Sequence, residues 1–342
     1  MAYVVQSTER THGIGAEYET KAMLYLMSCR EDSSQIYYFA IDFFNDVTGM
    51  TNFVDKAWDL QSKGAKNNSP KAIGKELVTL LKNFMSDLKF DFLILFLGGV
   101  TSTFRIDDKL TTFGIENVKD SAIKKVIEGI IEEGTDKEYI DSSWLSEENL
   151  NKFLNEVTFV IDDKSKAEYI KRIIAVNPKY IPKDEVLDGI FNTIRDAQTA
   201  KKNNSSVEGE VIQRMDEVLY YDRTLKAKDI RLMVVNVFIN GDLMNKNIPA
   251  YFFPVIQRYD VIKQKDVVED CRLKLSTVLF DKANTDSFWD LLDVIAEAVV
   301  GNRNLSTIET YNLIKDNESV HNPKMDMLTV QYLVSVMKEA LE

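Results

Sequence analysis

The order of apolar patterns between residues 13 and 100 is the feature that most limits the fold of this chain. Residues 15–27 repeat apolar side chains three and four positions apart, as one face of a helix does: Tyr18, Ala22, Met23, Leu26 and Met27. Three strand-like segments follow, then a helix over residues 69–88, then an apolar strand over residues 90–97. Because a strand–helix–strand step normally makes a right-handed parallel crossover, we expect a compact α/β sheet in this region.

The three strand-like segments differ in pattern. Residues 36–44 are aromatic and apolar, and the chain then bends at residues 45–49. A second strand lies either near Val47 or over residues 51–54. Residues 57–63 alternate, which places Asp59, Gln61 and Lys63 on one face of a strand. Ser69 and Pro70 then suit the N-cap and first position of the next helix.

Beyond residue 100 the patterns are mainly helical. We expect helices over residues 115–133, 147–154, 166–176, 183–200, 288–300 and 327–341, and strands over residues 156–161 and 230–239. The polar stretch 201–206 predicts a loop and a domain boundary. The expected division is an α/β core over residues 1–100, with an outer limit near residue 200, and an α-rich α+β domain over residues 205–342.

Composition and cysteine usage narrow the class of protein. The 342 residues contain only Cys29 and Cys271, far apart, which form neither a disulfide framework nor a zinc pattern and fit a reducing cytoplasm. The first residues lack the pattern of a signal peptide, and the strongest apolar run, 92–97, is too short to cross a bilayer. We therefore expect a cytoplasmic protein without a membrane partner. No P-loop motif is present, and His12 and His321 are too few for histidine-based zinc catalysis.

The charge distribution bears on nucleic-acid binding. A net charge of −12 argues against a general nucleic-acid binder. The first 100 residues carry only −2 of that charge, however, and six lysines lie between residues 56 and 82 beside two acidic residues. The predicted DNA contacts in this basic patch are Lys56, Lys66, Lys71 and Lys75. The alternative is a solvated helix face without a ligand.

Four side chains in successive elements match the needs of phosphodiester hydrolysis. Asp46 is the expected central ligand of Mg²⁺ (or Mn²⁺), and Gln61 offers a neutral carbonyl ligand beside it. Lys63, two residues later on the same strand face, suits the attacking water or the developing charge. Because Gln61 brings no charge, Glu19 from the first helix is the expected second acid.

Two more acids are additional candidates, and each residue of this set has a simpler reading. Glu17 lies on the same helix as Glu19, and Asp59 shares the strand face of Gln61. An Asp before a bend is often a turn former, and a Gln-x-Lys strand is often a solvated face. Acids near a helix start can simply favour the helix dipole.

These residues resemble a known family. Gly15-Ala16-Glu17-Tyr18-Glu19 is similar to the opening helix of Mrr-like nucleases, and Asn45-Asp46-Val47 with Asp59-Leu60-Gln61-Ser62-Lys63 resembles the metal-binding hairpin of the PD-(D/E)xK restriction-endonuclease fold. The match is to the variant with Gln in place of the second acid. Asn45 stands where the family name has Pro, at a position that varies in such enzymes. The resemblance covers about a quarter of the chain.

The resemblance implies a function. It extends to the nuclease domain of bacterial antiphage effectors, namely the endonucleases of cyclic-oligonucleotide signalling systems and the nuclease subunit of Lamassu-type systems, which degrade double-stranded DNA with Mg²⁺. It implies catalytic roles for Glu19, Asp46, Gln61 and Lys63, an αβββαβ core, and an enzyme that is held inactive until partner subunits, such as an SMC-like ATPase, trigger it, acting as an oligomer. Two alternatives stay open: a catalytically silent scaffold that keeps the nuclease fold, and an RNA-cutting toxin.

Overall fold

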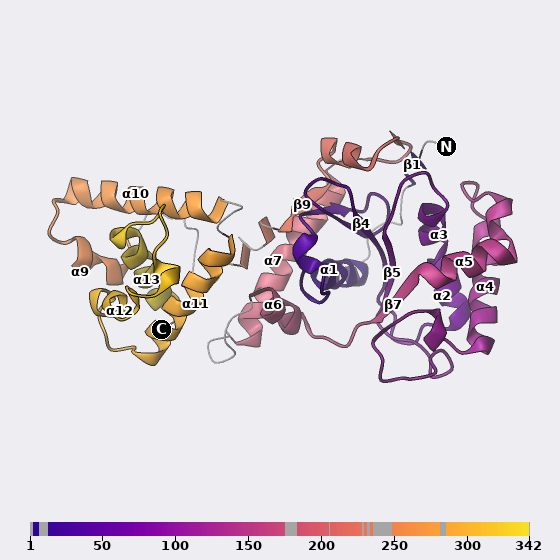
Figure 1. The fold of residues 1–342 in the computed structure, drawn as a ribbon, viewed down its shortest axis with the longest axis horizontal. Coiled ribbons are helices and arrows are strands. Elements are labelled where there is room, and N and C mark those ends of the chain that lie inside the picture. Colours follow the sequence, from indigo (N-terminus) through magenta and orange to yellow (C-terminus); the bar gives the residue numbers. More distant parts are fainter. Residues whose placement is uncertain are drawn as a thin grey trace. The chain divides into compact units, whose positions relative to one another are not determined.

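The computed structural model describes residues 3–6, 13–174, 183–204, 206–227, 229–230, 233–234, 248–280 and 285–341. The chain divides into two compact units (Figure 1). The first comprises Met1–Ile173 and Phe191–Ala227, and the second comprises Ile174–Ile190 and Lys228–Glu342.

A mixed seven-stranded sheet forms the centre of the first unit, in the order β6-β7-β5-β4-β3-β2-β9. Its strands are β2 (Tyr38–Ile41), β3 (Val47–Met50), β4 (Ala57–Lys63), β5 (Phe92–Leu97), β6 (Thr112–Phe113), β7 (Val157–Ile161) and β9 (Thr224–Lys226). The pairs β4–β5 and β5–β7 are parallel, and the other pairs are antiparallel. A separate two-stranded sheet joins β1 (Tyr3–Val4) to β8 (Val211–Ile212). The predicted α/β character is confirmed, and the sheet continues well beyond residue 100.

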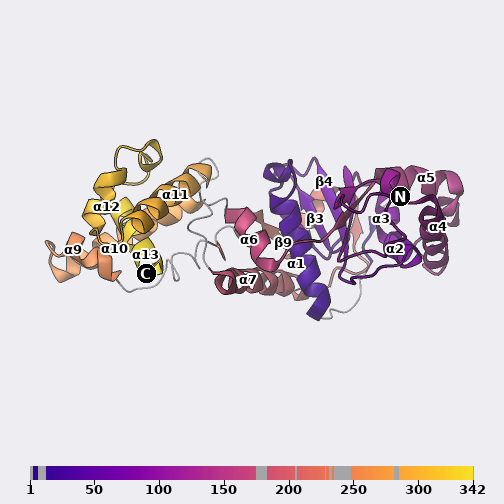
Figure 2. The same cartoon turned by 90° about the horizontal axis from the view of Figure 1, so that it is seen from below.

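Helices cover both faces of the seven-stranded sheet, as Figures 1 and 2 show. Tyr25 of α1 (Gly13–Ser28) contacts Phe96 of β5 on one face. On the other face, Leu95 and Leu97 of the same strand belong to an apolar core. The helices that contribute to this second core are α2 (Pro70–Glu76), α3 (Val78–Phe84), α4 (Asp120–Thr135) and α5 (Glu147–Glu156). Because side chains alternate along β5, α1 packs against one face of the sheet and α2 against the other.

The single helix predicted over residues 69–88 is two helices in the structure, α2 and α3. Ser69 caps the helix by accepting from the backbone N–H of Ala72, as expected from the sequence. At Leu77, however, the backbone ψ is −11° and the N–H bonds back to Gly74, so α2 ends and α3 begins. Gly74 also allows α2 to approach α4 closely, because a Cβ there would lie 2.1 Å from the carbonyl oxygen of Val126.

Two further helices, α6 (Lys166–Ile174) and α7 (Asp184–Asn203), follow β7 in the chain. The predicted loop at 201–206 is wrong in its first half, because Lys201, Lys202 and Asn203 form the last turn of α7. The predicted domain start at residue 205 also differs from the observed division, in which the first unit continues to Ala227 through β9.

The described part of the second unit is helical and shows no strand. Its longer helices are α9 (Phe253–Ile256), α10 (Val261–Phe280), α11 (Thr285–Gly301), α12 (Thr307–Ile314) and α13 (Met327–Leu341), packed around a core that includes Phe252, Leu275, Leu291, Ile295 and Leu333. The strand expected at 230–239 falls largely outside the described residues. Among the helices that the structure describes, none has the length and apolarity needed to cross a membrane.

Candidate functional site

Asp46 lies at the end of the β2–β3 connection, directly before β3. In the β3–β4 pairing Val47 faces Leu60, so the next pair along this register sets the backbone of Asp46 opposite Gln61. The Asp46 carboxylate is buried, and its Oδ2 accepts two hydrogen bonds from Ser62, one from the backbone N–H and one from the hydroxyl, each 2.7 Å long. Asp46 is therefore fixed to the carboxyl end of β4.

Glu19 reaches the same place from α1. The helix lies tightly against the residue after β4, because a Cβ at Gly64 would be 2.5 Å from the ring of Tyr18. Glu19 is 9% exposed, and its carboxylate accepts from Nζ of Lys202, at the end of α7, over 3.2 Å. Because Gly64 has no Cβ, Tyr18 and the adjacent Glu19 of α1 can lie close to the end of β4.

A third carboxylate, Asp42, completes the cluster. Nζ of Lys202 is 3.7 Å from one oxygen of Asp42, and Arg223 is 3.3 Å from the other. Arg223 also donates to the Asp42 carbonyl over 3.1 Å. Asp42 has a positive φ of 48°, a left-handed conformation that Asp tolerates better than most residues. We call Glu19, Asp42, Asp46 and Lys202 the acidic cluster.

Burial and like charge raise the pKa values of two carboxyls in the acidic cluster. Burial, and next the negative charge of Glu19, raise the pKa of Asp46 to about 8, although the Ser62 hydrogen bonds and Lys202 act in the opposite direction. Burial also raises the pKa of Glu19, which Lys202 lowers and Asp42 raises. Neighbouring buried carboxylates resist joint ionisation unless positive charge compensates them.

Lys63 does not join this cluster, contrary to the expectation from the sequence. Its Nζ forms a 2.7 Å ion pair with Glu76 of α2, on the sheet face opposite α1. Successive side chains of a strand point to opposite faces, so Ser62 faces α1 while Lys63 faces α2. The carboxylate of Asp46 is bound by Ser62 and therefore lies on the Ser62 side of the strand and not on the Lys63 side.

Gln61 does not join the acidic cluster either. Its side chain shares the strand face of Lys63 and Asp59, which faces α2 and α3, and so it lies on the face opposite Glu19 of α1. Its carbonyl Oε1 is buried and has no hydrogen-bond partner within the described residues. A buried acceptor without a donor costs free energy, so this oxygen is suited to a cation or a ligand N–H.

Asp59 has a structural role. It is fully buried and accepts hydrogen bonds from Thr48 Oγ1 at 2.8 Å, from Asn83 Nδ2 of α3 at 2.7 Å, and from Asn45 Nδ2. Burial raises its pKa to about 6 against the effect of these donors. Three neutral donors occupy the carboxylate, so Asp59 is poorly placed to be the additional ligand that the sequence suggested.

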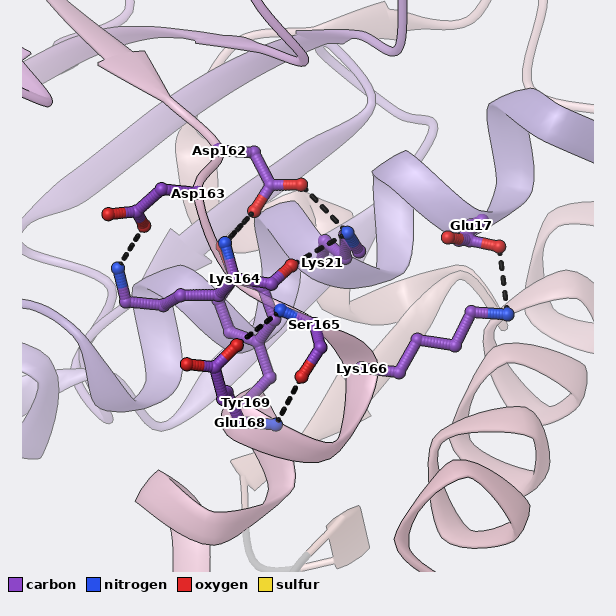
Figure 3. Close-up of polar contacts among 9 residues, drawn as sticks. All are labelled: Glu17, Lys21, Asp162, Asp163, Lys164, Ser165, Lys166, Glu168 and Tyr169. Atoms are coloured by element: carbon purple, nitrogen blue, oxygen red, sulfur yellow. Dashed lines mark hydrogen bonds and ion pairs between the residues drawn. The ribbon is translucent and has the colours of Figure 1, made fainter. Parts of the chain in front are cut away.

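Glu17 belongs to a second group of polar contacts, between α1 and the segment after β7 (Figure 3). It pairs with Lys166 of α6 at 2.8 Å, and Lys21, one turn further along α1, pairs with Asp162 at 2.8 Å. Asp162 follows β7 directly and also accepts from the Tyr169 hydroxyl over 3.0 Å. These contacts attach α1 to the segment after β7 and leave Glu17 outside the acidic cluster.

The predicted DNA-contacting lysines do not form one patch. Lys71 and Lys75 both pair with Glu132 of α4, and their hydrogen bonds lower the pKa of that carboxyl to about 2. Lys56 lies before β4, where its Nζ donates to Gln35 over 3.0 Å, and Lys66 follows β4, with its Nζ 5.7 Å from the centre of the Tyr18 ring. Seven strand residues separate these two ends by roughly 20 Å.

Sequence reasoning missed Asp42, Ser62, Lys202 and Arg223. Ser62 lies inside the Gln-Ser-Lys triplet, but strand alternation places it on the face opposite the predicted Gln61 and Lys63. Lys202 is 183 residues from Glu19, a distance over which no local pattern predicts a contact.

The donor set present fits a divalent ion of the Mg²⁺ type. Glu19 and Asp46 offer buried carboxylate oxygens, and Mg²⁺ ordinarily keeps several waters besides few protein ligands. Within the described part of the chain, no three His, Cys, Asp or Glu residues are arranged to hold a metal by themselves. An ion held there would therefore take its remaining ligands from water.

Comparison of the chain with protein-family models, with curated proteins and with solved structures finds no match.

Proposed function

We propose that the first unit is a metal-dependent endonuclease that hydrolyses phosphodiester bonds of double-stranded DNA. The observation that carries the proposal is the buried acidic cluster at the carboxyl end of β4, where Lys202 lies 3.2 Å from Glu19 and 3.7 Å from Asp42, and the backbone N–H of Asp42 donates to the carbonyl of Asp46 over 3.0 Å. Glu19 and Asp46 come from separate elements, yet the charge of one raises the pKa of the other. Such an arrangement is unfavourable without a cation, and groups of this kind gather at functional sites.

The topology supports a restriction-endonuclease-like core. The chain runs from α1 through the antiparallel strands β2, β3 and β4, then through α2 and α3 to β5, which is parallel to β4. This is the αβββαβ order that the family resemblance implies. The carboxyl ends of parallel strands are where α/β sheets ordinarily place their ligands, and the acidic cluster lies at that end of β4.

Glu19 and Asp46 would hold Mg²⁺ or Mn²⁺, with water as the other ligands. When bound, the ion supplies charge neutralisation at the phosphoryl oxygens and a more acidic water. Ser62 keeps the Asp46 carboxylate in a fixed orientation through two hydrogen bonds. Lys202 and Arg223 compensate the remaining negative charge of Glu19 and Asp42.

The biological role that we propose follows from the family resemblance. The enzyme would be the nuclease effector of a bacterial antiphage system, restrained until partner subunits, such as an SMC-like ATPase, activate it as an oligomer. The second unit would bind these partners. The uneven distribution of charge along the chain supports the proposal that the nuclease is restrained. The chain beyond residue 100 carries a net charge of −10, which disfavours non-specific binding to DNA.

The test is cleavage of supercoiled plasmid and of RNA, side by side, by the full-length protein with Mg²⁺ or Mn²⁺. Because the isolated protein would be restrained, the protein is used in excess over plasmid, and we expect slow cleavage that EDTA stops and that Asp46→Ala and Glu19→Gln each abolish. Glu17→Gln is the matched control, since it removes a carboxylate of the same helix outside the acidic cluster. Cleavage that survives Asp46→Ala would refute the assignment, and cleavage of RNA alone would favour the toxin.

A silent scaffold is the second candidate. The ion pair of Lys63 with Glu76 and the contact of Lys202 with Glu19 both engage charged groups within the protein itself. Calorimetry with Mn²⁺ separates the two candidates. A scaffold would bind no Mn²⁺ at the acidic cluster, and Asp46→Ala would leave the titration unchanged.

A further inference from the structure

A lysine can assist phosphodiester hydrolysis only if its ammonium group lies close to Glu19 and Asp46, the proposed metal ligands. In that reaction a bond forms between a water oxygen and phosphorus while an ester P–O bond breaks. One proton leaves the water and one is taken up by the departing oxygen. A cation beside the phosphoryl group stabilises the charge that builds up during this exchange, provided it lies beside the groups that hold the metal.

Lys202 satisfies this condition better than Lys63. Nζ of Lys202 is 3.2 Å from Glu19 and 3.7 Å from Asp42, and its side chain is 9% exposed. Its charge also reaches Asp46, because it lowers the pKa of that carboxyl. Lys63, in contrast, pairs with Glu76 and has a side chain that is 43% exposed.

The last turn of α7 holds Lys202 in this place. One turn earlier, Gln198 is buried and its Oε1 accepts from the Thr20 hydroxyl over 2.8 Å, next to Glu19 in α1. Residues four apart share a helix face, so Gln198 and Lys202 both face α1. On the other side Lys201 pairs with Asp222, which also accepts from Asn204 over 2.7 Å.

We infer that Lys202, and not Lys63, is the active-site lysine of the proposed nuclease. Its ammonium group would contact a phosphoryl oxygen of the DNA beside Glu19 and offset the developing negative charge, keeping its own protons throughout. The inference rests on the proposed function and changes its residue assignment. The sequence pattern assigns the lysine by spacing within one strand, whereas the structure supplies it from a helix late in the first unit.

The simpler role for Lys202 is that of a counter-ion that only lets Glu19 and Asp42 be buried together. A counter-ion of that kind affects stability, and its loss changes turnover only through unfolding. The experiment must therefore separate turnover from folding and from metal binding.

The experiment compares full-length wild type with Lys202→Met, Lys202→Arg, Lys63→Met and Lys201→Met. Lys201→Met is the matched control, because it removes the neighbouring lysine whose partner, Asp222, lies outside the acidic cluster. Plasmid cleavage gives kcat and KM, Mn²⁺ calorimetry gives metal affinity, and thermal melting reports folding.

We expect Lys202→Met to lower kcat by about 100-fold or more while KM changes by less than about threefold. Mn²⁺ affinity should be equal or higher, because a positive charge near the ion has been removed. Lys202→Arg should regain about tenfold of the lost kcat, since it restores the charge but not the shape. Lys63→Met should lose less than about tenfold.

Three outcomes would overturn the inference. Lys202→Met, folded, could keep a kcat within about threefold of wild type. Lys63→Met could be the more damaged variant. Lys202→Met could exceed wild type, which would make Lys202 a restraint on the site. If Lys202→Met fails to fold, Lys202→Gln decides by the same criteria. A wild type that cleaves neither duplex DNA nor RNA refutes the proposed function itself, and the inference with it.

Discussion

Asp46 and Asp59 are both buried carboxylates on neighbouring strands, but their surroundings differ in kind. Asp59 is met by three neutral donors, from Thr48, Asn45 and Asn83, and has no negative neighbour among its contacts. Asp46 is met by the two donors of Ser62 and by the like charge of Glu19. The first carboxylate is satisfied by neutral donors within the fold, whereas the second is also opposed by a like charge. Burial alone therefore does not mark a site.

The largest effect should separate the two aspartates by activity. Asp46→Asn keeps the shape and can still accept from Ser62, but it removes the charge that a metal needs. We expect a loss of plasmid cleavage of about 1000-fold or more. Asp59→Asn, as a folded protein, should retain cleavage within about tenfold. Equal losses in both variants would remove the distinction between the two carboxylates.

The next effect concerns stability. Asp59→Ala leaves the donors of Asn45, Thr48 and Asn83 buried without their acceptor, and we expect a loss of roughly 3 kcal/mol in the free energy of unfolding. Asp46→Ala frees only the two Ser62 donors and removes a like-charge repulsion, so its loss should be smaller. Chemical denaturation monitored by tryptophan fluorescence, with Trp58 in β4 as a buried probe, measures both. A larger loss for Asp46→Ala would reverse the comparison.

The pH dependence of stability sharpens the comparison further. A carboxyl whose pKa is higher in the folded state binds more protons there than in the unfolded chain. Its contribution to the free energy of unfolding is therefore full at low pH and is lost as the pH rises. For Asp59 the loss is complete near pH 6, and for Asp46 near pH 8. Between pH 6 and 8, wild type should therefore lose stability that Asp46→Asn does not lose.

Melting curves without divalent ions at pH 6 and 8 test this expectation. Asp59→Asn serves as the control, because it should follow wild type between these two values. Parallel behaviour of Asp46→Asn and wild type would show that Asp46 is ionised throughout this range.

The smallest effect is expected at the lysines of α2. Glu132 already offsets Lys71 and Lys75, so Lys75→Ala should change DNA affinity by less than about twofold. Lys66→Ala should weaken binding more and lower the salt dependence by about one charge, because Lys66 follows β4 beside the acidic cluster. Fluorescence anisotropy with a labelled duplex at several salt concentrations measures the affinity and its salt dependence. Equal effects of Lys75→Ala and Lys66→Ala would instead indicate that the predicted lysines form one DNA-binding patch.

The sequence predicted the elements of the first unit better than the side-chain geometry of the site. Apolar periodicity located α1, β4, β5 and β7 closely, because burial of one face repeats along each element. It could not decide between Val47 and residues 51–54 for β3, since the bend contains both apolar and turn residues. The break at Leu77 was also missed, because the apolar pattern continues across it.

The site was predictable only where local pattern determines position. Glu19 and Asp46 were identified from their elements, and the structure brings them together. Lys63 was expected at the site because it shares the strand face of Gln61, whereas the carboxylate of Asp46 is bound by Ser62, which faces the other side of the sheet. Lys202 and Arg223 enter through the packing of α7 and β9, which depends on contacts across the whole unit.

The close approach of α2 to α4 has a mechanical consequence. A Cβ at Gly74 would lie 2.1 Å from one backbone carbonyl, and a Cβ at Gly129 would lie 2.2 Å from that of Lys71, so the two helices touch through their main chains. Helices in such contact cannot slide or tilt without a steric clash. Any motion of α2 must therefore carry α4 with it, so the two helices act as one rigid support for their face of the sheet.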